Sequence, residues 1–444
     1  MNSVLIIGAG LSSGALIDYV LRKAAEKGWV VIVADSDLQK AEAKVAGHPN
    51  GRAVWLDVLK TNDRRELIAR ADVVVSLMPA HLHLEVAYDC IKLKKHLITA
   101  SYVSQEMFAL ADEARERGLI FMGEMGLDPG IDHMSAMRAI DAIKGQGGAI
   151  RSFHSYTGGL VAPESDDNPW HYKVTWNPRN VVLAGQGTAQ FLEDGKLRYI
   201  PYHRLFKEHR KLEIPGAGQY EAYANRDSLL YRERYGIADI PNILRGTIRH
   251  KGFCESWDAL IQIGLTDAGF PILHSGEISF YELLDAYVGK YQGGSLKERV
   301  AQMLGQAPDS EVMRNLEWLG LFRKKKIRLP NATPALILEH VIREKWVLNP
   351  NDRDMILMYH ELEYELDGKS YGFKSTMQLK GNHAADTAMA QTVGLPMGIF
   401  VRMVMEGNIQ ARGVQIPVMK EVYDPVLKEL EEYGIVFHEE VFPL

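Results

Sequence analysis

Residues 1–35 constrain the fold of this chain more than any other stretch. An apolar run, Val4–Ile7, ends in the glycine-rich segment Gly8–Gly14. Apolar residues at helical spacing follow from about Ser12, and a second apolar run, Val30–Ala34, ends in Asp35. The order strand, glycine turn, helix, strand and acid predicts a βαβ unit that binds a dinucleotide.

Each residue of the glycine turn has a physical reason to be there. Gly8 allows a tight turn out of the strand, and Gly10 leaves room for a pyrophosphate to approach the backbone. The helix that follows directs its free N–H groups and the positive end of its dipole at the phosphates. Ser13 replaces the third glycine of the pattern and is small enough for close helix–strand packing. The expected pyrophosphate-binding residues are Gly8, Gly10, Leu11, Ser12 and Ser13.

Asp35 indicates which dinucleotide is preferred. A carboxylate at the end of the second strand accepts hydrogen bonds from the adenosine ribose hydroxyls and repels a 2′-phosphate. The residues that follow are Ser36, Asp37 and Leu38, with no adjacent Arg or Lys. NAD is therefore the expected cofactor, with NADP as the alternative. A second interpretation is that Asp35 only caps the next helix.

Composition and length narrow the class of protein. The 444 residues allow two or three domains, and 46% of them are hydrophobic, enough for substantial cores. The formal charge of −6 and the lack of a long basic run disfavour nucleic-acid binding. The first strand leaves no room for a signal peptide, and no apolar run of membrane-spanning length is expected. We therefore expect a cytoplasmic protein that does not enter a membrane.

The cysteines and histidines predict no metal site. Cys90 and Cys254 are far apart and form no CxxC pair, which suits a reducing cytosol. His81 and His83 have no partner at metal-ligand spacing, so they are expected at the surface or at a helix entry. His133 follows Asp132, and either orients that acid or forms a hydrogen bond at a helix start.

Alternating strand and helix patterns continue to about residue 125 and predict a parallel, doubly wound sheet. Ligands gather at the carboxyl ends of such strands. The polar residues at these ends are Asp35, Asp57, Ser76–Met78 and Ser101-Tyr102. The further strands are expected at Ala53–Leu56, Val73–Leu77, Leu97–Ala100 and Leu119–Met122, with a helical stretch at Gln105–Arg117.

The remaining chain is expected to form two further domains. Gly126–Gly130 breaks the rhythm and leads into a helix at Ile131–Ile143. Asp367-Gly368-Lys369 between two apolar runs, Ile356–Leu366 and Tyr371–Leu379, predicts a hairpin. The expected division is a dinucleotide-binding domain at 1–127, a mixed-sheet substrate domain at 128–254 and 349–380, a helical insertion at 255–348, and C-terminal helices at about 381–444 that pack back on the first domain.

Tyr156–Pro169 is the densest polar cluster of the chain. Its glycines and prolines predict a long irregular loop, and such loops inside compact domains are often functional. Its parts read Tyr-Thr-Gly-Gly-Leu, Ala-Pro-Glu and Asp-Asn-Pro, and Tyr172–Trp176 reads Tyr-Lys-Val-Thr-Trp.

Together with GLDPGIDH at Gly126–His133, these motifs resemble those of the saccharopine dehydrogenases that form glutamate. Three further segments are similar to motifs of the same family, namely Asn225–Ser228, Leu244–Phe253 and Gly381–Pro396. The resemblance implies oxidation of saccharopine to an imine, which water splits into glutamate and 2-aminoadipate 6-semialdehyde, or the reverse condensation. It also implies a dinucleotide-binding domain, a mixed-sheet domain that closes over the substrate, and an inserted helical domain.

Saccharopine carries three carboxylates, so its site needs fixed cations. Arg226 and Arg249 supply planar forks for carboxylates. The alternative is that either forms a surface ion pair. The resemblance implies that the substrate is bound by Arg226, by the segment Thr247, Ile248 and Arg249, and by the pair Ser101 and Tyr102. Asp128 corresponds to an aspartate near the substrate amines. The resemblance also adds Trp176 to the expected cofactor-binding residues, beside Asp57 and Val58 at the adenine and Ser76, Leu77 and Met78 on the path to nicotinamide.

Asp128 and Tyr102 are the expected catalytic residues. Asp128 would pair with an ammonium or move protons, and Tyr102 would donate a hydrogen bond or assist proton transfer. The alternatives are helix capping for Asp128 and aromatic packing for Tyr102. Several members of the family carry Cys where this chain has Thr157, which cannot titrate near neutral pH. The cofactor-selecting position of Asp35 also differs among members.

Two other functions fit parts of the pattern. The first is an enzyme similar to carboxynorspermidine dehydrogenase, whose amine-rich substrate would need acids where Arg226 and Arg249 stand. The second is a dinucleotide-binding protein without catalysis, which would have no need of the segment Tyr156–Trp176. The expected partner is the small-molecule substrate, and a homodimer is plausible.

Overall fold

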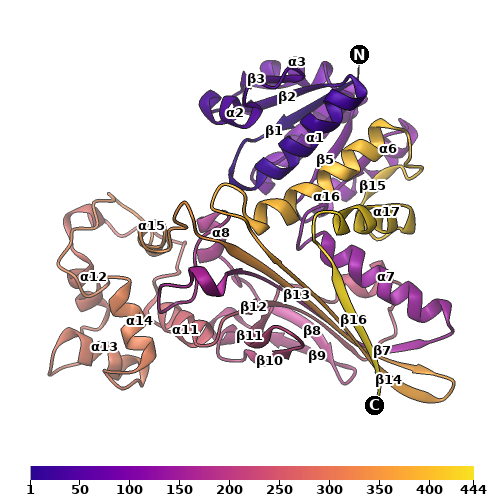
Figure 1. Ribbon diagram of the computed structural model, residues 1–444. Coiled ribbons are helices and arrows are strands. Elements are labelled where there is room, and N and C mark those ends of the chain that lie inside the picture. The colour runs from indigo at the N-terminus through magenta and orange to yellow at the C-terminus, as the bar shows by residue number, and fades with distance from the viewer. Residues whose placement is uncertain (1) are drawn as a thin grey trace. The chain divides into compact units, whose positions relative to one another are not determined.

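The computed structural model describes residues 2–444, which divide into two compact units (Figure 1). The first unit holds the chain up to Ile150, together with Tyr364–Ser370 and Met377–His438. The second holds Arg151–Glu363, Tyr371–Thr376 and Glu439–Leu444. This division differs from the one expected from the sequence, because 128–150 belongs to the first unit and the helical stretch 255–348 belongs to the second.

Within residues 2–444, the first unit is built on a sheet of seven strands. They are β1 (Ser3–Ile7), β2 (Val30–Asp35), β3 (Gly51–Trp55), β4 (Val73–Ser76), β5 (His96–Thr99), β6 (Ile120–Met122) and β15 (Gly413–Gln415). Their order is β15-β6-β5-β4-β1-β2-β3, and all paired strands run parallel. The order reverses between β1 and β4, which is the point where such sheets bind ligands at their carboxyl ends.

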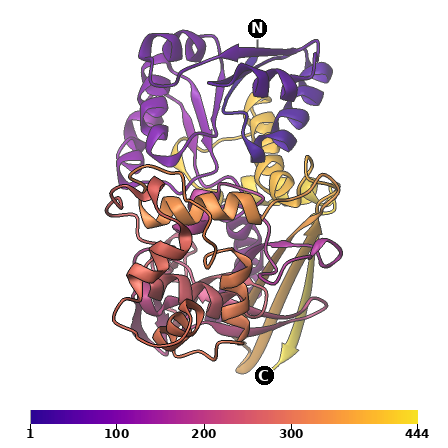
Figure 2. The ribbon, with the colours of Figure 1, turned by 90° about the vertical axis from the view of Figure 1, so that its left-hand side faces the viewer.

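Helices of the first unit surround this sheet (Figure 2). They are α1 (Gly14–Lys27), α2 (Leu38–Val45), α3 (Thr61–Ala69), α4 (His83–Leu93), α5 (Gln105–Phe108), α6 (Ala111–Glu116), α7 (Ile131–Gly145), α16 (Ala388–Met405) and α17 (Lys420–Glu431). The single helix expected over Gln105–Arg117 is two helices, because Leu110 N–H bonds to the Met107 carbonyl and tightens the backbone between α5 and α6.

Close packing of α16 on α1 returns the C-terminal chain to the first unit. An ideal Cβ on Gly394 would lie 2.6 Å from the backbone nitrogen of Leu16, and one on Gly398 would lie 2.7 Å from the Tyr19 ring. The two glycines therefore let the helices approach. By length and composition alone, α16 is long and apolar enough to cross a membrane. However, 72% of its 18 residues are buried inside the protein.

The second sheet has nine strands within the described residues 2–444. They are β7 (Ala149–Val161), β8 (Ala189–Glu193), β9 (Lys196–Ile200), β10 (Arg210–Ile214), β11 (Gly218–Ala224), β12 (Asn242–Arg249), β13 (Asp354–Leu366), β14 (Lys369–Lys380) and β16 (Phe437–Pro443). Strands β12 and β7 pair parallel, whereas β12 pairs antiparallel with β11. A parallel sheet and a mixed sheet confirm the predicted fold class.

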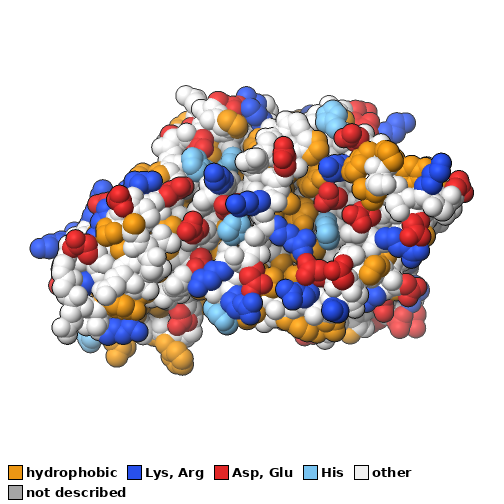
Figure 3. All heavy atoms as spheres, turned by 90° about the horizontal axis from the view of Figure 1, so that it is seen from below, with side chains coloured by type: hydrophobic (Ala, Val, Ile, Leu, Met, Phe, Trp, Pro, Cys, Tyr) orange, Lys and Arg blue, Asp and Glu red, His pale blue; other side chains and the backbone are white. Residues whose placement is uncertain are grey.

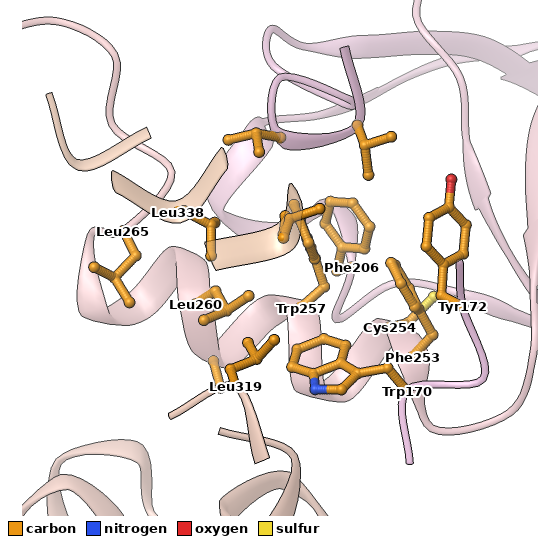
Figure 4. Packing of buried hydrophobic residues seen from close by; sticks show 14 of the residues in the cluster. Trp170, Tyr172, Phe206, Phe253, Cys254, Trp257, Leu260, Leu265, Leu319 and Leu338 are labelled. Carbon is orange, nitrogen blue, oxygen red and sulfur yellow. The ribbon is translucent and has the colours of Figure 1, made fainter. Parts of the chain in front are cut away.

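An aromatic core lies beside this sheet in the second unit (Figure 4). Phe253 and Trp257 stack at 5.6 Å between ring centroids, and Trp170 meets both rings edge-on. The helices of this unit are α8 (Pro178–Val182), α9 (Tyr202–Leu205), α10 (Leu230–Arg234), α11 (Phe253–Ile263), α12 (Phe280–Tyr287), α13 (Leu296–Leu304), α14 (Glu311–Trp318) and α15 (Pro334–Lys345).

The segment expected to be irregular at Tyr156–Pro169 is partly a strand, so that prediction was wrong for its first half. Tyr156–Val161 continues β7. An ideal Cβ on Gly158 would lie 2.8 Å from both Cβ and the carbonyl oxygen of Ile248 on β12. The glycine that suggested a loop is needed for close strand packing.

Acidic and basic side chains are interspersed over the molecular face that Figure 3 presents. Hydrophobic side chains on that face occur as smaller patches between them. Among residues 2–444, no group of three or more His, Cys, Asp or Glu side chains is arranged to hold a metal ion.

Candidate active site

The two glycines of the first turn are needed for different reasons. Gly8 has φ +112°, and a Cβ there would lie 3.1 Å from Leu77 Cβ, so the protein itself requires glycine. Gly10 has an ordinary φ of −73°, and a Cβ there would meet nothing within 4 Å. The space beside Gly10 is therefore open to a ligand. The hydroxyl of Ser13 donates to the Gly10 carbonyl at 2.9 Å and braces the turn, while Leu11 is 65% exposed.

Asp35 lies at the end of β2 with both carboxylate oxygens held by backbone donors. The N–H of Ala9 donates to Oδ2 at 2.7 Å, and the N–H of Asp37 donates to Oδ1 at 2.8 Å. Asp37 itself caps α2 through the Lys40 N–H and pairs with Lys40 Nζ at 3.2 Å. Asp37 is therefore paired with a lysine one helical turn further along the chain.

The other expected cofactor residues of the first unit follow the carboxyl ends of β3 and β4. Asp57 accepts the Leu59 N–H at 3.1 Å, and the Val58 carbonyl accepts from the buried Arg64 side chain at 2.5 Å. Ser76 ends β4, followed by Leu77 and Met78. The fold therefore brings the first-unit residues of this set to one edge of one sheet. Trp176 is in the second unit, where its ring nitrogen donates to the Tyr172 hydroxyl at 3.3 Å.

His83 is a residue of this edge that the sequence analysis did not assign to the site. It is buried, and its ring bridges Ser76 Oγ and Ser101 Oγ at 2.9 Å each, across the ends of β4 and β5. Burial, together with the nearby His81, lowers the pKa of His83 to about 4. His83 was expected at the surface or at a helix entry. It is the first residue of α4, so the helix-entry alternative is correct and the surface alternative is wrong. The only sequence signal for this role is position. His83 begins the helix that follows β4, and a serine stands at or just after the ends of β4 and β5.

Tyr102 and Asp128, the expected catalytic pair, meet in the first unit. The Tyr102 hydroxyl donates to Asp128 Oδ1 at 3.0 Å. A cavity of about 70 Å³ lies beside Tyr102, lined also by His83, Thr99 and Gly123. The pair combines a carboxylate able to accept a proton with a phenol that orients it.

Arg249 is a buried cation of the second unit, only 4% exposed. Its carbon Cζ lies 5.3 Å from the ring centres of Tyr172 and Phe253 and 5.6 Å from that of Tyr223. Its Nη1 donates to the Ile248 carbonyl and its Nη2 to the Tyr223 hydroxyl, while the buried Nε has no partner in the described chain. A buried guanidinium without a carboxylate is costly unless an anion joins it.

The neighbours of Arg249 on β12 divide between the two faces of the sheet. Thr247 is register partner of Thr157 on β7, whose buried hydroxyl has no partner among residues 2–444. Because side chains alternate, Thr247 and Arg249 share a face with Thr157. Ile248 points the other way and is fully buried, so only its backbone can face a ligand. Arg226 follows β11, exposed at its surface, with φ +44°.

The first unit is a parallel sheet with a glycine-rich first turn, an acid at the end of β2 and polar groups after β4 and β5. This is the architecture of a dinucleotide-binding domain. The chain belongs to the saccharopine dehydrogenase family. Residues 4–122 match the model of the saccharopine dehydrogenase NADP binding domain, and residues 126–435 match that of the saccharopine dehydrogenase C-terminal domain.

Relatives and solved structures agree along the whole chain. Saccharopine dehydrogenase [NADP(+), L-glutamate-forming] of Pyricularia oryzae is 36% identical over 99% of both chains, and that of Saccharomyces cerevisiae is 34% identical over 99% of both. The apo structure of the Saccharomyces cerevisiae enzyme superposes with a TM-score of 0.89, at 33% identity and 100% coverage of both chains. Alpha-aminoadipic semialdehyde synthase of Arabidopsis thaliana is 33% identical over 98% of this chain and 44% of its own length.

Proposed function

We propose that this chain oxidises L-saccharopine at its secondary amine, with NAD(P) as oxidant, to L-glutamate and 2-aminoadipate 6-semialdehyde, or runs the reverse condensation. In the oxidative direction a C–H hydride and the N–H proton leave, and one water is added across the resulting imine. The enzyme would act in lysine metabolism. Membership of the family and the match to glutamate-forming relatives over 99% of both chains support this assignment.

The observation that carries the proposal is the buried guanidinium of Arg249. Its free Nε and its aromatic surroundings suit a ligand carboxylate, which would satisfy the donor and neutralise the charge. Arg226 would bind a second carboxylate from its exposed position on the same unit. Thr247 and the backbone of Ile248 would contribute polar groups beside Arg249.

Asp128, Tyr102 and Ser101 would handle the reacting amine. Asp128 pairs with the ammonium, takes up the proton released when the imine forms, and activates the water that splits it. Tyr102 orients Asp128 through their hydrogen bond. Ser101, held by His83, would bind the substrate next to Tyr102. Thr157 would act only as a hydrogen-bond donor, because its hydroxyl does not titrate near neutral pH.

The open space beside Gly10 and the oriented carboxylate of Asp35 fit a nicotinamide dinucleotide, which would accept or supply the hydride. Gly8, Leu11, Ser12 and Ser13 would cradle its pyrophosphate. We propose that NAD is preferred, because Asp35 would accept from the ribose hydroxyls. The matched family domain and the fungal relatives are named for NADP, so the proposed preference for NAD rests on Asp35 alone.

Two further features are proposed with the activity. The chain would work in the cytoplasm, and a homodimer is its plausible assembly, which light scattering would determine.

An amine-rich substrate is less suitable, because it would bring a positive charge to Arg249. The structure of Legionella pneumophila homospermidine synthase, at 12% identity and a TM-score of 0.57, shares the fold alone.

The test is oxidation of NADH and NADPH in the presence of glutamate and 2-aminoadipate semialdehyde, compared with aspartate semialdehyde and a diamine. Turnover with the first pair and product identified as saccharopine by mass spectrometry support the proposal. Turnover with the diamine pair alone would replace it with the related polyamine chemistry. Dinucleotide binding with neither turnover would make the chain a non-catalytic binder.

A further inference from the structure

A buried polar cluster, Glu124, Asp132 and His133, lies behind the Tyr102–Asp128 pair in the first unit. Glu124 follows β6 and has φ +54°, a conformation that side-chain-bearing residues adopt rarely. Each of the three residues is at most 1% exposed. Strained backbone and buried charge together cost free energy, and both tend to occur where geometry matters for function.

Glu124 connects β6 to the segment that carries Tyr102. Its N–H donates to the Ser101 carbonyl at 3.1 Å, and its Oε1 accepts from the N–H of Val103 at 3.1 Å. These two bonds hold the backbone on both sides of Tyr102. The unusual φ of Glu124 lets one residue make the backbone bond and the side-chain bond to the same segment.

The other carboxylate oxygen leads to the segment that carries Asp128. Glu124 Oε2 lies 2.8 Å from His133 Nε2, and His133 Nδ1 lies 3.5 Å from Asp132 Oδ2. Asp132 Oδ1 in turn accepts from the N–H of Gly130 at 2.6 Å. A continuous polar chain therefore runs from Val103, next to Tyr102, to Gly130, close to Asp128.

We propose that Glu124, His133 and Asp132 are positioning residues, which hold Tyr102 and Asp128 at hydrogen-bonding distance for the reaction. The inference rests on the proposed function for its chemistry. The cluster fixes the two backbone segments, and the 3.0 Å bond between Tyr102 Oη and Asp128 Oδ1 is what their placement produces. A displacement of about 1 Å at such a pair is enough to lower turnover by up to roughly 100-fold.

The experiment is a double-mutant cycle in the full-length chain between His133→Gln and Tyr102→Phe, followed by kcat and KM for saccharopine. His133→Gln is expected to lower kcat by about tenfold or more, to move the pH profile of kcat, and to leave the Kd for NADH unchanged. Because His133 acts through the pair, the double variant should be no slower than the slower single variant. The control is Asp141→Asn on the same helix, whose carboxylate accepts from the Tyr423 hydroxyl at 2.6 Å, and it should leave kcat unchanged.

Glu124→Gln is the second variant and is used if His133→Gln folds poorly. The glutamine keeps an acceptor for the Val103 N–H, and the same non-additivity with Tyr102→Phe is expected. Additive losses in both cycles, or an unchanged pH profile, would overturn the inference. If the wild type does not turn over saccharopine, the proposed function fails separately. Amide hydrogen exchange of the variants, compared with the wild type, then tests the role of the cluster. Faster exchange in the peptides 99–106 and 124–132 of the variants supports the inference, and unchanged exchange in either peptide overturns it.

Discussion

The carboxylate of Asp35 accepts a hydrogen bond from the N–H of Ala9 at 2.7 Å, so the acid expected to bind ribose also fixes the glycine turn. Its other oxygen accepts the Asp37 N–H at 2.8 Å. A carboxylate has about four acceptor positions, which leaves lone pairs for ribose hydroxyls. The acid expected to bind ribose and the turn expected to bind pyrophosphate are therefore one hydrogen-bonded unit.

Asp35→Asn and Asp35→Ala should both reduce discrimination between NAD and NADP. Asn keeps an acceptor for the turn but loses the charge that repels a 2′-phosphate, so its kcat/KM should fall less with NAD than that of Ala. With the charge gone, the ratio of kcat/KM for NAD over NADP should fall by about tenfold in both, the equivalent of roughly 1.4 kcal/mol. Steady-state kinetics with each cofactor measures the ratio. A wild type that prefers NADP, or variants with an unaltered ratio, would refute the role given to Asp35.

Gly8→Ala and Gly10→Ala should separate the two roles of the turn. At Gly8 the left-handed φ and the nearby Leu77 make alanine strained, so the free protein should lose about 1–3 kcal/mol of unfolding free energy. At Gly10 the backbone accommodates alanine, so the Tm of the free protein should not fall, yet NADH should bind at least several-fold more weakly. Thermal unfolding and fluorescence titration test both. Equal loss of Tm in the two variants would contradict the distinction.

His83 should make the protein less stable in acid. Burial lowers its folded-state pKa to about 4, against about 6.5 in the unfolded chain. Because the unfolded chain binds the proton more tightly, stability should fall as the pH drops from 6.5 to 4, by roughly 3 kcal/mol from this group. His83→Gln removes that dependence and keeps hydrogen bonds to Ser76 and Ser101 feasible. Urea unfolding at several pH values should show a shallower slope for the variant, and equal slopes would rule out the buried neutral form.

Much of the first sheet could be predicted from the sequence, because parallel strands are short apolar runs and their polar residues stand at the ends. β2 was predicted to within a residue, and Asp35 stands at its end as expected. The strand at Tyr156–Val161 was missed because Gly158 and Gly159 look like a turn. Only the partner strand, with Ile248 against Gly158, explains why glycine is required there.

The polar groups behind the site were harder to foresee. Nothing local requires His83 to be buried or Glu124 to adopt φ +54°, since both depend on neighbouring strand ends that the sequence does not place. Arg249 was chosen for its charge, and its aromatic surroundings come from Tyr172, Tyr223 and Phe253 on three separate segments. Residue types could be predicted, but burial and pairing could not.

Arg249→Met should stabilise the free protein while it removes substrate binding. The guanidinium is buried without a carboxylate among the residues that the structure describes, and an apolar side chain of similar length would avoid that desolvation cost. We expect an unfolding free energy equal to the wild type or up to about 4 kcal/mol higher, and a KM for saccharopine raised by about 100-fold or more, with the Kd for NADH unchanged. Arg249→Lys is the matched control, because it keeps the charge but not the planar fork, and its KM should lie between the two. Calorimetry and saccharopine kinetics measure both effects. A clearly destabilised Arg249→Met variant with an unaltered KM would show that Arg249 is a structural residue rather than a carboxylate site.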